Sequence, residues 1–509
     1  MKVSAYAFLA FGALGLSLGS TTPKQIAIIG GGASGSSAAM YIAQAMQEAS
    51  IPCQITIYEK NSRLGGRVQS FNVPATNLIV EAGASIFVNI NYNLMDAASQ
   101  FGLNVIDAGI EQSLANPPNA IWNQTGIEYQ TTGNEAVDTA GMLERFGAYT
   151  LQTVSNFVSE IVTKYMQIYG ATTTAFNTIN DMLVFMGVQD TTTTTAQAAL
   201  DAFPDLNQLF LTERVDISTR VNYGQSLAQI HTMGMAISMA AGSSGGLQIQ
   251  AGNQRIFERM AAASGASISL NTPVASVAKQ TTSVGDTQYV VTTKTGKATT
   301  FDAVVMASPP NTYHDAAIQW KNLTSGAYLS NPGALSPPVN YYLIHVTFVA
   351  GVLRPSYFNR GTPTLNMNII PLENYSTQGG STVLPWTSLS HEYVLTTTDT
   401  FNICKYNKNS TSVITPSAVF TVTKLFSPQP LSESVLNQMY SIRLWTKSVQ
   451  HYAYPNLVPR SGSNMPPMTV DTQLYFPNAF EPFISTMETS TVSSRNVANL
   501  IVRDFGGSS

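Results

Sequence analysis

A glycine-rich stretch near the N-terminus has the residue types and spacing that suit a phosphate-binding loop. It carries a G-x-G-x-x-G pattern between a short apolar run, 24–29, and an Ala/Met-rich run, 36–48. Between a strand and a helix, such glycines permit a tight turn and let backbone amides approach a pyrophosphate at the helix N-terminus. We therefore predict a dinucleotide-binding loop. Its binding residues are Gly30, Gly32, Ala33, Ser34 and Gly35.

An acidic residue ends the next predicted strand. Glu59 closes the run 51–59 and is followed by Lys60. At this distance from a glycine loop, a carboxylate can accept a hydrogen bond from a ribose hydroxyl of the dinucleotide. The alternative is a solvated acid at a strand end. The combination with the glycine loop favours the nucleotide interpretation, and we assign both Glu59 and Lys60 to the cofactor site.

The segment 60–67 indicates which cofactor the loop binds, a flavin or a nicotinamide dinucleotide. Its glycine pair and Arg67 resemble the second signature of glutathione-reductase-like flavoproteins of the amine oxidase type. The resemblance implies FAD, with Arg67 reaching the dinucleotide and Gly66 letting the chain pass beside it. A further element, 81–85, resembles the segment that brings backbone to the isoalloxazine ring. The residues implied there are Gly83 and Ala84, and the family commonly has a second glycine where Ala84 stands.

Two later segments fit the same cofactor. The run 272–277 resembles the strand whose backbone, near Val274, pairs with the adenine. The run 304–310 resembles the strand end that lies beside the dinucleotide. Either run could also be ordinary sheet core, but their order in the chain favours the flavoprotein interpretation.

The rest of the chain resembles the prenylcysteine oxidase (prenylcysteine lyase) family over nearly all of its mature length. The landmarks, in order, are 222–226 with His231, then 252–253, 454–455, 474–475 and 487–488. Residues 478–481, Asn-Ala-Phe-Glu, depart from the family's Asn-Gly-x-Glu, and 181–195 and 372–409 match nothing that we can place. The resemblance implies an FAD-dependent thioether oxidase. It would cleave farnesyl- or geranylgeranyl-cysteine, with O2 as acceptor, to a prenyl aldehyde, cysteine and hydrogen peroxide during breakdown of prenylated proteins.

Two residues outside the nucleotide signatures could contribute to the site. His231 is our candidate for assisting the attack of water, although a histidine among Met and Ile is often a satisfied core residue. Glu488 could bond ribityl or ring atoms of the flavin, or it could be a helix-start carboxylate favoured by the helix dipole. No Cys or His spacing indicates a metal site.

The order of these elements predicts an α/β fold, in which a glutathione-reductase-like Rossmann FAD-binding domain is interleaved with an α+β substrate domain. Within the first domain, 265–309 should form a small antiparallel excursion that returns to a parallel strand. In the second, 343–352 and 393–398 suggest a further sheet. The uncharged run 226–246 favours a buried helix over a membrane span. The FAD-binding domain is assigned to 24–110, 243–310 and 465–505, and the substrate domain to 111–242 and 311–464.

Composition limits the class of protein. The chain has 509 residues, of which 44% are hydrophobic, as is typical of globular proteins. Only 11% are charged, so the surface must rely on Ser, Thr, Asn and Gln rather than on ions. A net charge of −4 without a basic stripe argues against nucleic acid as a partner. The two cysteines, Cys53 and Cys404, could pair or remain as buried thiols. The alternatives to the thioether oxidase are a secreted flavin amine oxidase-like enzyme and an inactive flavin- or lipid-binding protein.

The N-terminus predicts entry into the secretory pathway. Residues 1–19 combine a lysine, a short apolar run and a small-residue exit, which is typical of a cleaved signal peptide. The alternative is an uncleaved membrane anchor. We expect a secreted or vacuolar/lysosomal glycoprotein with no transmembrane segment after cleavage, and we allow for peripheral membrane contact. Four N-glycosylation sequons are present, at Asn123, Asn322, Asn374 and Asn409.

Overall fold

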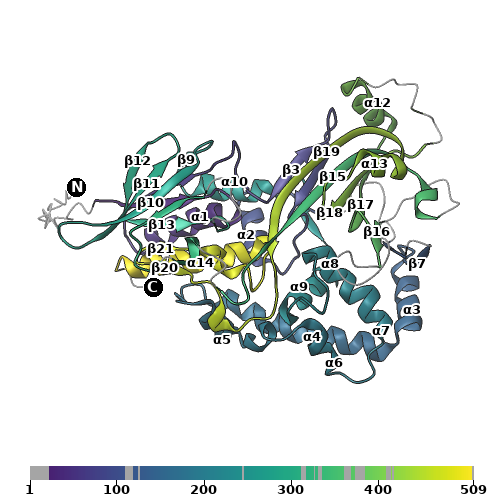
Figure 1. Ribbon diagram of the computed structural model, residues 1–509, viewed down its shortest axis with the longest axis horizontal. Coiled ribbons are helices and arrows are strands. Elements are labelled where there is room, and N and C mark those ends of the chain that lie inside the picture. The colour runs from purple at the N-terminus through teal and green to yellow at the C-terminus, as the bar shows by residue number, and fades with distance from the viewer. Residues whose placement is uncertain are drawn as a thin grey trace, which may run out of the picture.

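The computed structural model has two lobes joined by long strands (Figure 1). It describes residues 22–108, 119–123, 126–243, 246–310, 317–325, 327–330, 335–359, 368–372, 384–408, 414 and 418–506. The predicted signal peptide and two of the sequons, Asn374 and Asn409, lie outside these residues. Cys53 and Cys404 do not form a disulfide with each other, so the alternative of two separate thiols applies.

The first lobe is built on a six-stranded sheet in which β1 lies at the centre. β1 pairs in parallel with β2 on one side and with β13 on the other. Helices α1 and α14 pack against each other beside this sheet (Figure 1). The strand order is β20-β21-β13-β1-β2-β9. The elements are β1 Lys24–Ile29, α1 Ala33–Glu48, β2 Cys53–Tyr58, α2 Tyr92–Gln100, α10 Gln254–Ala263, β9 Ser267–Ser269, β13 Ala303–Met306, β20 Thr469–Asp471, β21 Leu474–Tyr475 and α14 Met487–Asp504.

This sheet draws strands from all three segments that we assigned to the FAD-binding domain, and the α/β fold class is confirmed. The predicted antiparallel excursion is also confirmed, because β10 Val274–Thr281, β11 Thr287–Thr293 and β12 Ala298–Phe301 pair antiparallel before β13 rejoins β1. One strand extends this small sheet beyond the segment we expected. β14 Gln319–Lys321 pairs in parallel with β10, although residue 319 lies in the predicted substrate domain.

The second lobe contains a seven-stranded sheet in the order β19-β15-β18-β17-β16-β6-β7. The prediction of a strand at 343–352 is confirmed by β15. The prediction of a strand that runs through 393–398 is wrong. There β17 ends at Val394, and Thr396 starts α12 through a capping box with Asp399. The elements are β6 Asn119–Trp122, β7 Ile127–Gln130, β15 Tyr341–Leu353, β16 Asn368–Pro371, β17 Ser388–Val394, α12 Thr397–Tyr406, β18 Thr421–Ser427, α13 Glu433–Met439 and β19 Tyr440–Pro455.

Helices form the lower part of the second lobe (Figure 1). The uncharged helix α9 is buried along most of its first two turns, as Met233 and Met235 are fully shielded from solvent. No helix in the described ranges is long and apolar enough to cross a membrane. The helices are α3 Glu135–Phe146, α4 Ala148–Tyr165, α5 Ile179–Met186, α6 Ala196–Asp201, α7 Gln208–Phe210, α8 Ile217–Tyr223 and α9 Thr232–Ser243. The short helix α11 Ala327–Ser330 instead contacts β14 of the first lobe's small sheet.

A two-stranded hairpin links the lobes. Its strands, β3 Gln69–Asn72 and β4 Ile79–Gly83, pair antiparallel, and their apolar side chains share one core cluster with β15 and β18. Val80 and Phe348 are buried members of this cluster, and the Lys447 ammonium of β19 lies 4.3 Å from the Phe71 ring centroid. Because the hairpin packs on the large sheet, the end of β4 at Gly83 lies at the junction of the two lobes. A short pair, β5 Val105–Asp107 with β8 Leu247–Ile249, completes the sheets.

Candidate cofactor and active site

The glycine loop leaves no room for side chains where it turns into α1. A Cβ atom at Gly35 would lie 1.8 Å from the carbonyl oxygen of Gly30, and one at Gly30 would lie 2.7 Å from that of Ala307. Helix α1 begins after Gly32 with no side chain capping its amides and no acidic residue in its first turn. The positive end of the helix dipole therefore stays available, which fits a pyrophosphate.

The second glycine signature packs directly on the first. The amide of Gly65 donates to the carbonyl oxygen of Gly31 at 2.9 Å, and Gly32 and Gly65 form an isolated parallel bridge. Gly66 has a φ of +57°, and a Cβ there would lie 2.9 Å from the Cα of Gly32. The two motifs, more than thirty residues apart in sequence, thus form one cradle.

Glu59 is buried at the end of β2, so the alternative of a solvated acid is wrong. Its side chain is 4% exposed. Oε2 accepts from the Gly31 amide at 2.8 Å, and Oε1 accepts from the backbone and side-chain nitrogens of Asn61 at 2.8 and 2.7 Å. An ionised carboxylate has about four acceptor positions, so one remains for a ribose hydroxyl. Lys60 beside it is exposed.

Val274 lies next to this acid. It is buried at the start of β10, and the amide of Thr272, two residues earlier, donates to the carbonyl oxygen of Glu59 at 2.8 Å. The structure therefore brings together the glycine loop, the acid and the predicted adenine strand. Their individual contacts with the cofactor stay predictions.

The turn at Ala84 adopts a glycine-like conformation without a glycine. Ala84 has a φ of +54°, in the left-handed region. The side-chain amide of Asn253 donates to the carbonyl oxygens of Ala84 and Ser85 at 2.8 and 3.1 Å, while its backbone amide donates to Glu81 Oε1 at 2.7 Å. The landmark at 252–253 thus clamps the turn that follows β4.

Ala84→Gly should not destabilise the protein and is expected to stabilise it by up to about 1 kcal/mol. A left-handed backbone costs an L-residue roughly 1–2 kcal/mol, and the greater unfolded-state freedom of glycine offsets part of that gain. Thermal unfolding measures the change. The control is Ala82→Gly, because Ala82 is a buried strand residue without a positive φ. Equal losses of thermal stability in Ala84→Gly and Ala82→Gly would contradict backbone strain at Ala84.

Glu81, just before this turn, is a buried carboxyl group with a shifted pKa. Burial raises the pKa of Glu81 to about 7, against hydrogen bonds from the Asn253 amide and the Ser70 hydroxyl and the charge of Lys424. Lys424 of β18 donates to the Ser85 hydroxyl at 3.1 Å and forms an ion pair with Glu392 at 3.1 Å. Polar groups of both lobes therefore converge on 81–85.

Arg67 connects the glycine cradle to two distant segments. Its guanidinium donates to the carbonyl oxygen of Ala453 on β19 at 2.9 Å and forms an ion pair with Glu481. Burial alone would lower the pKa of Arg67, but the Glu481 carboxylate beside it raises that pKa above its usual value. Glu481 also accepts from the Tyr341 hydroxyl at 2.6 Å and from the side-chain amide of Asn478 at 2.7 Å. Residues 478–481 depart from the family's Asn-Gly-x-Glu, but the two polar residues of that pattern, Asn478 and Glu481, are present and in contact.

Arg63 has a more local role. Its guanidinium donates to the carbonyl oxygens of Gly66 at 2.8 Å and Leu64 at 3.1 Å, which fixes the second glycine turn. The direct contact of Arg67 with the dinucleotide, implied by the family resemblance, stays a prediction. The observed contacts show a guanidinium that positions the cradle against the C-terminal segment.

His231 has both ring nitrogens engaged by backbone. It is completely buried, Nδ1 accepts from the Gly234 amide at 3.1 Å, and Nε2 lies 3.1 Å from the carbonyl oxygen of Pro482. A carbonyl can only accept, so Nε2 carries the proton and no lone pair is left on the ring. Burial lowers the pKa of His231 to about 4. This geometry matches the alternative of a satisfied core histidine, and a catalytic role for His231 stays an untested prediction.

Glu488 uses its carboxylate on protein donors. The oxygens accept from the amides of Asn93 and Leu94, each at 3.0 Å, and from the Tyr169 hydroxyl at 2.8 Å. Burial raises the pKa of Glu488 to about 7. The interpretation of Glu488 as a carboxylate at a helix start therefore fits. The N-terminal amides that it accepts from belong to α2, however, and not to α14, where Glu488 itself lies.

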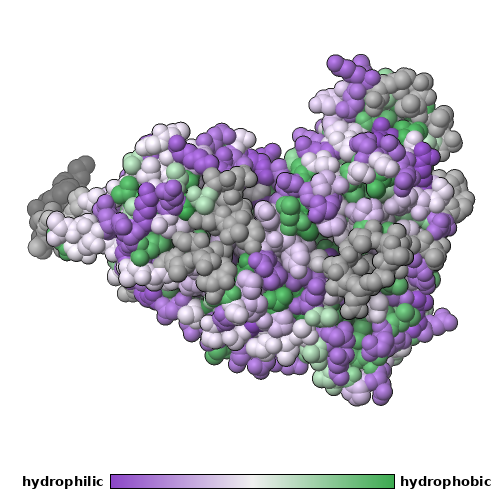
Figure 2. Space-filling view, viewed as in Figure 1, coloured by the Kyte–Doolittle hydropathy of each residue, from purple (hydrophilic) through white to green (hydrophobic). Residues whose placement is uncertain are grey.

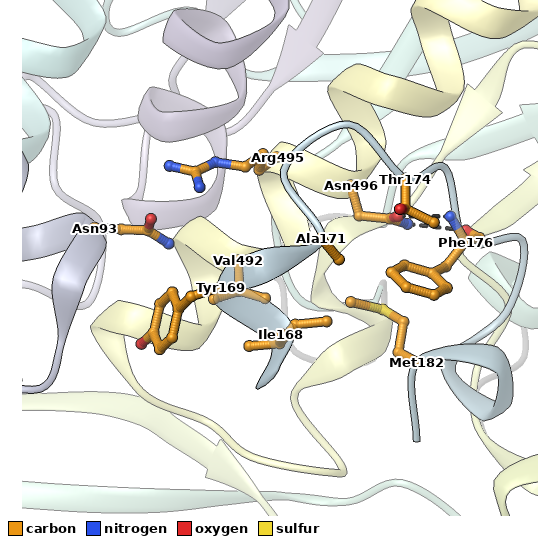
Figure 3. A pocket seen from close by; sticks show the side chains of 10 residues that line it. All are labelled: Asn93, Ile168, Tyr169, Ala171, Thr174, Phe176, Met182, Val492, Arg495 and Asn496. Carbon is orange, nitrogen blue, oxygen red and sulfur yellow. Dashed lines mark hydrogen bonds between the residues drawn. The ribbon is translucent and has the colours of Figure 1, made fainter. Parts of the chain in front are cut away.

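A small cavity adjoins these partners of Glu488. Figure 3 shows Asn93 and Tyr169 at one end and Phe176 and Met182 at the other. Its volume of about 20 Å³ is enough for one water molecule and far too small for a flavin ring. Contact of Glu488 with the flavin stays a prediction that this cavity does not support.

A second histidine, which the sequence did not single out, lies at the lobe junction. His451 of β19 packs its imidazole edge on Gly83, where a Cβ would lie 2.9 Å from Nε2. It lies opposite Ile344 of β15, and Ala453, two residues later, binds Arg67. A lone histidine in an alternating strand gives no sequence signal of function. Only the packing of β19 on the end of β4 reveals it.

Comparisons with known proteins agree with this arrangement. The prenylcysteine lyase family model matches residues 129–509, and a model of the NAD(P)-binding Rossmann-like domain matches 28–101. A farnesylcysteine lyase of Arabidopsis thaliana is 27% identical over 95% of this chain and 89% of its own length. A prenylcysteine oxidase 1 of Homo sapiens is 23% identical over 95% and 90%.

Solved structures share the fold at low identity. A putrescine oxidase with bound putrescine aligns over 95% of this chain and 99% of its own, with a TM-score of 0.58 and 13% identity. A cyclohexylamine oxidase from Brevibacterium oxydans IH-35A aligns over 95% and 100%, with a TM-score of 0.55 and 10% identity. With the cradle geometry and the family match over three quarters of its length, the chain belongs to the prenylcysteine lyase family and is an FAD-dependent oxidoreductase.

Proposed function

We propose that this enzyme cleaves the thioether of a prenylated cysteine to a prenyl aldehyde, free cysteine and hydrogen peroxide, with O2 as the final acceptor. The observation that carries the proposal is the match of the prenylcysteine lyase family over 129–509, which includes all of the second lobe's large β15–β19 pair. FAD, when bound, supplies the acceptor for a hydride from the carbon between sulfur and the alkene.

The chain's own residues have three tasks in this reaction. The glycine cradle and Glu59 hold the dinucleotide, and the clamped turn at 83–85 fixes the backbone at the lobe junction. The packing of β19 on this turn at Gly83 would limit the access of bulk water, which would otherwise compete for reactive species. An isoprenoid chain would bind mainly through burial of its apolar surface, because each buried methylene contributes about 0.8 kcal/mol.

A substrate panel on the purified FAD-loaded protein tests the proposal. Farnesylcysteine and geranylgeranylcysteine should release peroxide, aldehyde and cysteine thiol in equal amounts. Short S-allyl cysteine should react with a much higher KM, since it lacks most of the apolar chain. Faster peroxide release from putrescine or cyclohexylamine would instead identify an amine oxidase. Bound FAD without turnover of any of these compounds would identify a binding protein.

The same proposal places the enzyme in the secretory pathway, as a secreted or vacuolar/lysosomal glycoprotein. It is supported by the leader-like residues 1–19 and the four sequons. Expression in a eukaryotic host, followed by N-terminal sequencing and glycosidase treatment, tests it. A mature chain that still begins at Met1 and shows no shift in mass would contradict it.

A further inference from the structure

The imidazole of His451 occupies a position between the two lobes that the reaction could use. The chain of close contacts runs from the cradle to this ring. Gly66 lies against Gly32, the carbonyl oxygen of Arg67 lies against Gly83, and Gly83 lies against His451. If Glu59 binds the ribose of the adenosine half, as we predict, the flavin half would extend from the glycine loop toward this other side.

No hydrogen bond joins either ring nitrogen of His451 to another residue of the described chain. His231 differs in this respect, because backbone groups engage both of its nitrogens. The ring of His451 is only partly buried, so its nitrogens stay open to a water molecule or a ligand at the lobe junction. The neutral ring has one lone pair, which can accept a proton.

The charges that face His451 keep it neutral. Burial, then the guanidinium groups of Arg67 and Arg63, lower the pKa of His451 to about 4. Arg67 is itself paired with Glu481, Lys447 lies further along β19 over Phe71, and Ile344, directly opposite on β15, is apolar. Above about pH 5 the ring is therefore available as a base.

We propose that His451 is the base that accepts a proton from the water molecule that attacks the oxidised thioether. This role rests on the proposed function. After the hydride has left, the carbon is joined to sulfur as a thiocarbenium ion. The water oxygen bonds to that carbon, and His451 takes the proton that the oxygen loses.

The resulting hemithioacetal then collapses with balanced proton transfer. The C–S bond breaks, its electron pair goes to sulfur, and the imidazolium of His451 protonates that sulfur. The hydroxyl proton returns to the imidazole and then passes to solvent. The products of this sequence are the aldehyde and the free cysteine thiol, and no further oxidant is needed after the hydride transfer.

His451→Gln tests the role, with His345→Gln as its matched control. His345 is the other histidine of the β15–β19 pair, and it faces the opposite side of the sheet beside Gln450. General bases typically contribute about 10²–10⁴-fold, so thiol release by His451→Gln should fall at least about 100-fold at unchanged FAD content. His345→Gln should stay within about threefold of the wild type.

Two further readouts separate a base from a structural residue. Anaerobic bleaching of the flavin by farnesylcysteine precedes the attack of water, so it should change far less than thiol release. Wild-type kcat should decline on the acid side as His451 is protonated near pH 4, and His451→Gln should lack this decline. His451→Asn, which is shorter, should behave in the same way if the role is chemical.

Three results would overturn the role of His451 as a base. Thiol release that survives in His451→Gln overturns the inference, as does an unchanged acid decline in that variant. An equal fall in bleaching and thiol release also overturns it, since it would make His451 a structural residue. If the wild-type enzyme itself released no thiol from farnesylcysteine, the proposed function would fail instead, which keeps the two failures distinguishable.

Discussion

Gly35→Ala is expected to leave the purified protein without bound FAD. The added Cβ would lie 1.8 Å from the carbonyl oxygen of Gly30 and 3.2 Å from the Cβ of Ala307. Neither the loop nor the end of β13 can move away without changing the position of the first turn of α1. Overpacking of this kind typically costs 1–3 kcal/mol, which corresponds to about a 5- to 150-fold loss of cofactor affinity if it falls on the bound state.

The ratio of flavin absorbance to protein absorbance measures this loss, and thermal unfolding reports the accompanying destabilisation. Gly141→Ala in α3 is the matched control. It also adds a methyl group to a helical glycine, but the nearest atom, the Tyr129 hydroxyl, lies 3.9 Å away. Alanine there should raise stability by about 0.5–1 kcal/mol and leave FAD untouched. Full flavin occupancy in Gly35→Ala would refute the placement of the loop.

The cofactor half could be predicted because its signals are local in sequence. The glycine loop, the strand before it and the acid after the second strand all fall within 24–60, and their spacing is dictated by one strand–helix–strand unit. Glu59 illustrates the limit of this reasoning. The spacing predicts its place, but only the structure shows that its carboxylate also fixes Gly31.

The catalytic half could not be predicted, because its contacts join distant parts of the chain. Arg67 meets Ala453 and Glu481 across 386 and 414 residues. The partners of Glu488 lie about 320 to 395 residues away. No periodicity or motif encodes such pairs. The sequence therefore indicates His231, which has unusual neighbours, and gives no signal for His451.

Residue propensity predicts the wrong secondary structure at one segment, 395–398. The threonine-rich run 395–398 has the β-branched residues of a strand, yet the hydroxyl of Thr396 accepts from the Asp399 amide and begins α12. A capping box satisfies backbone groups that a strand would have to pair elsewhere, and it outweighs the β-propensity of three residues.

Arg67→Ala should both destabilise the protein and release FAD, and it should release more FAD than Arg63→Ala does. The change leaves the Glu481 carboxylate, which is 3% exposed, without its cationic partner. Removal of one member of a fully buried pair costs about 3–5 kcal/mol. The loss should lie below that range here, because the Arg67 side chain is 27% exposed and Tyr341 and Asn478 still donate to Glu481. Denaturant unfolding and flavin absorbance measure the two effects.

Glu481→Gln combined with Arg67→Ala distinguishes an unpaired charge from lost packing. A neutral amide needs no cation, so the double variant should recover part of the stability that Arg67→Ala loses, which gives a favourable coupling energy. Arg443→Ala is the control for a generic ion pair, because its partner Glu433 is 74% exposed and such surface pairs contribute at most about 1 kcal/mol. If Arg67→Ala were no more damaging than Arg443→Ala, the bridge from the glycine cradle to β19 would not be structural. If the double variant retained the full loss of FAD while it regained stability, Arg67 would act on the dinucleotide itself, as the family resemblance implies.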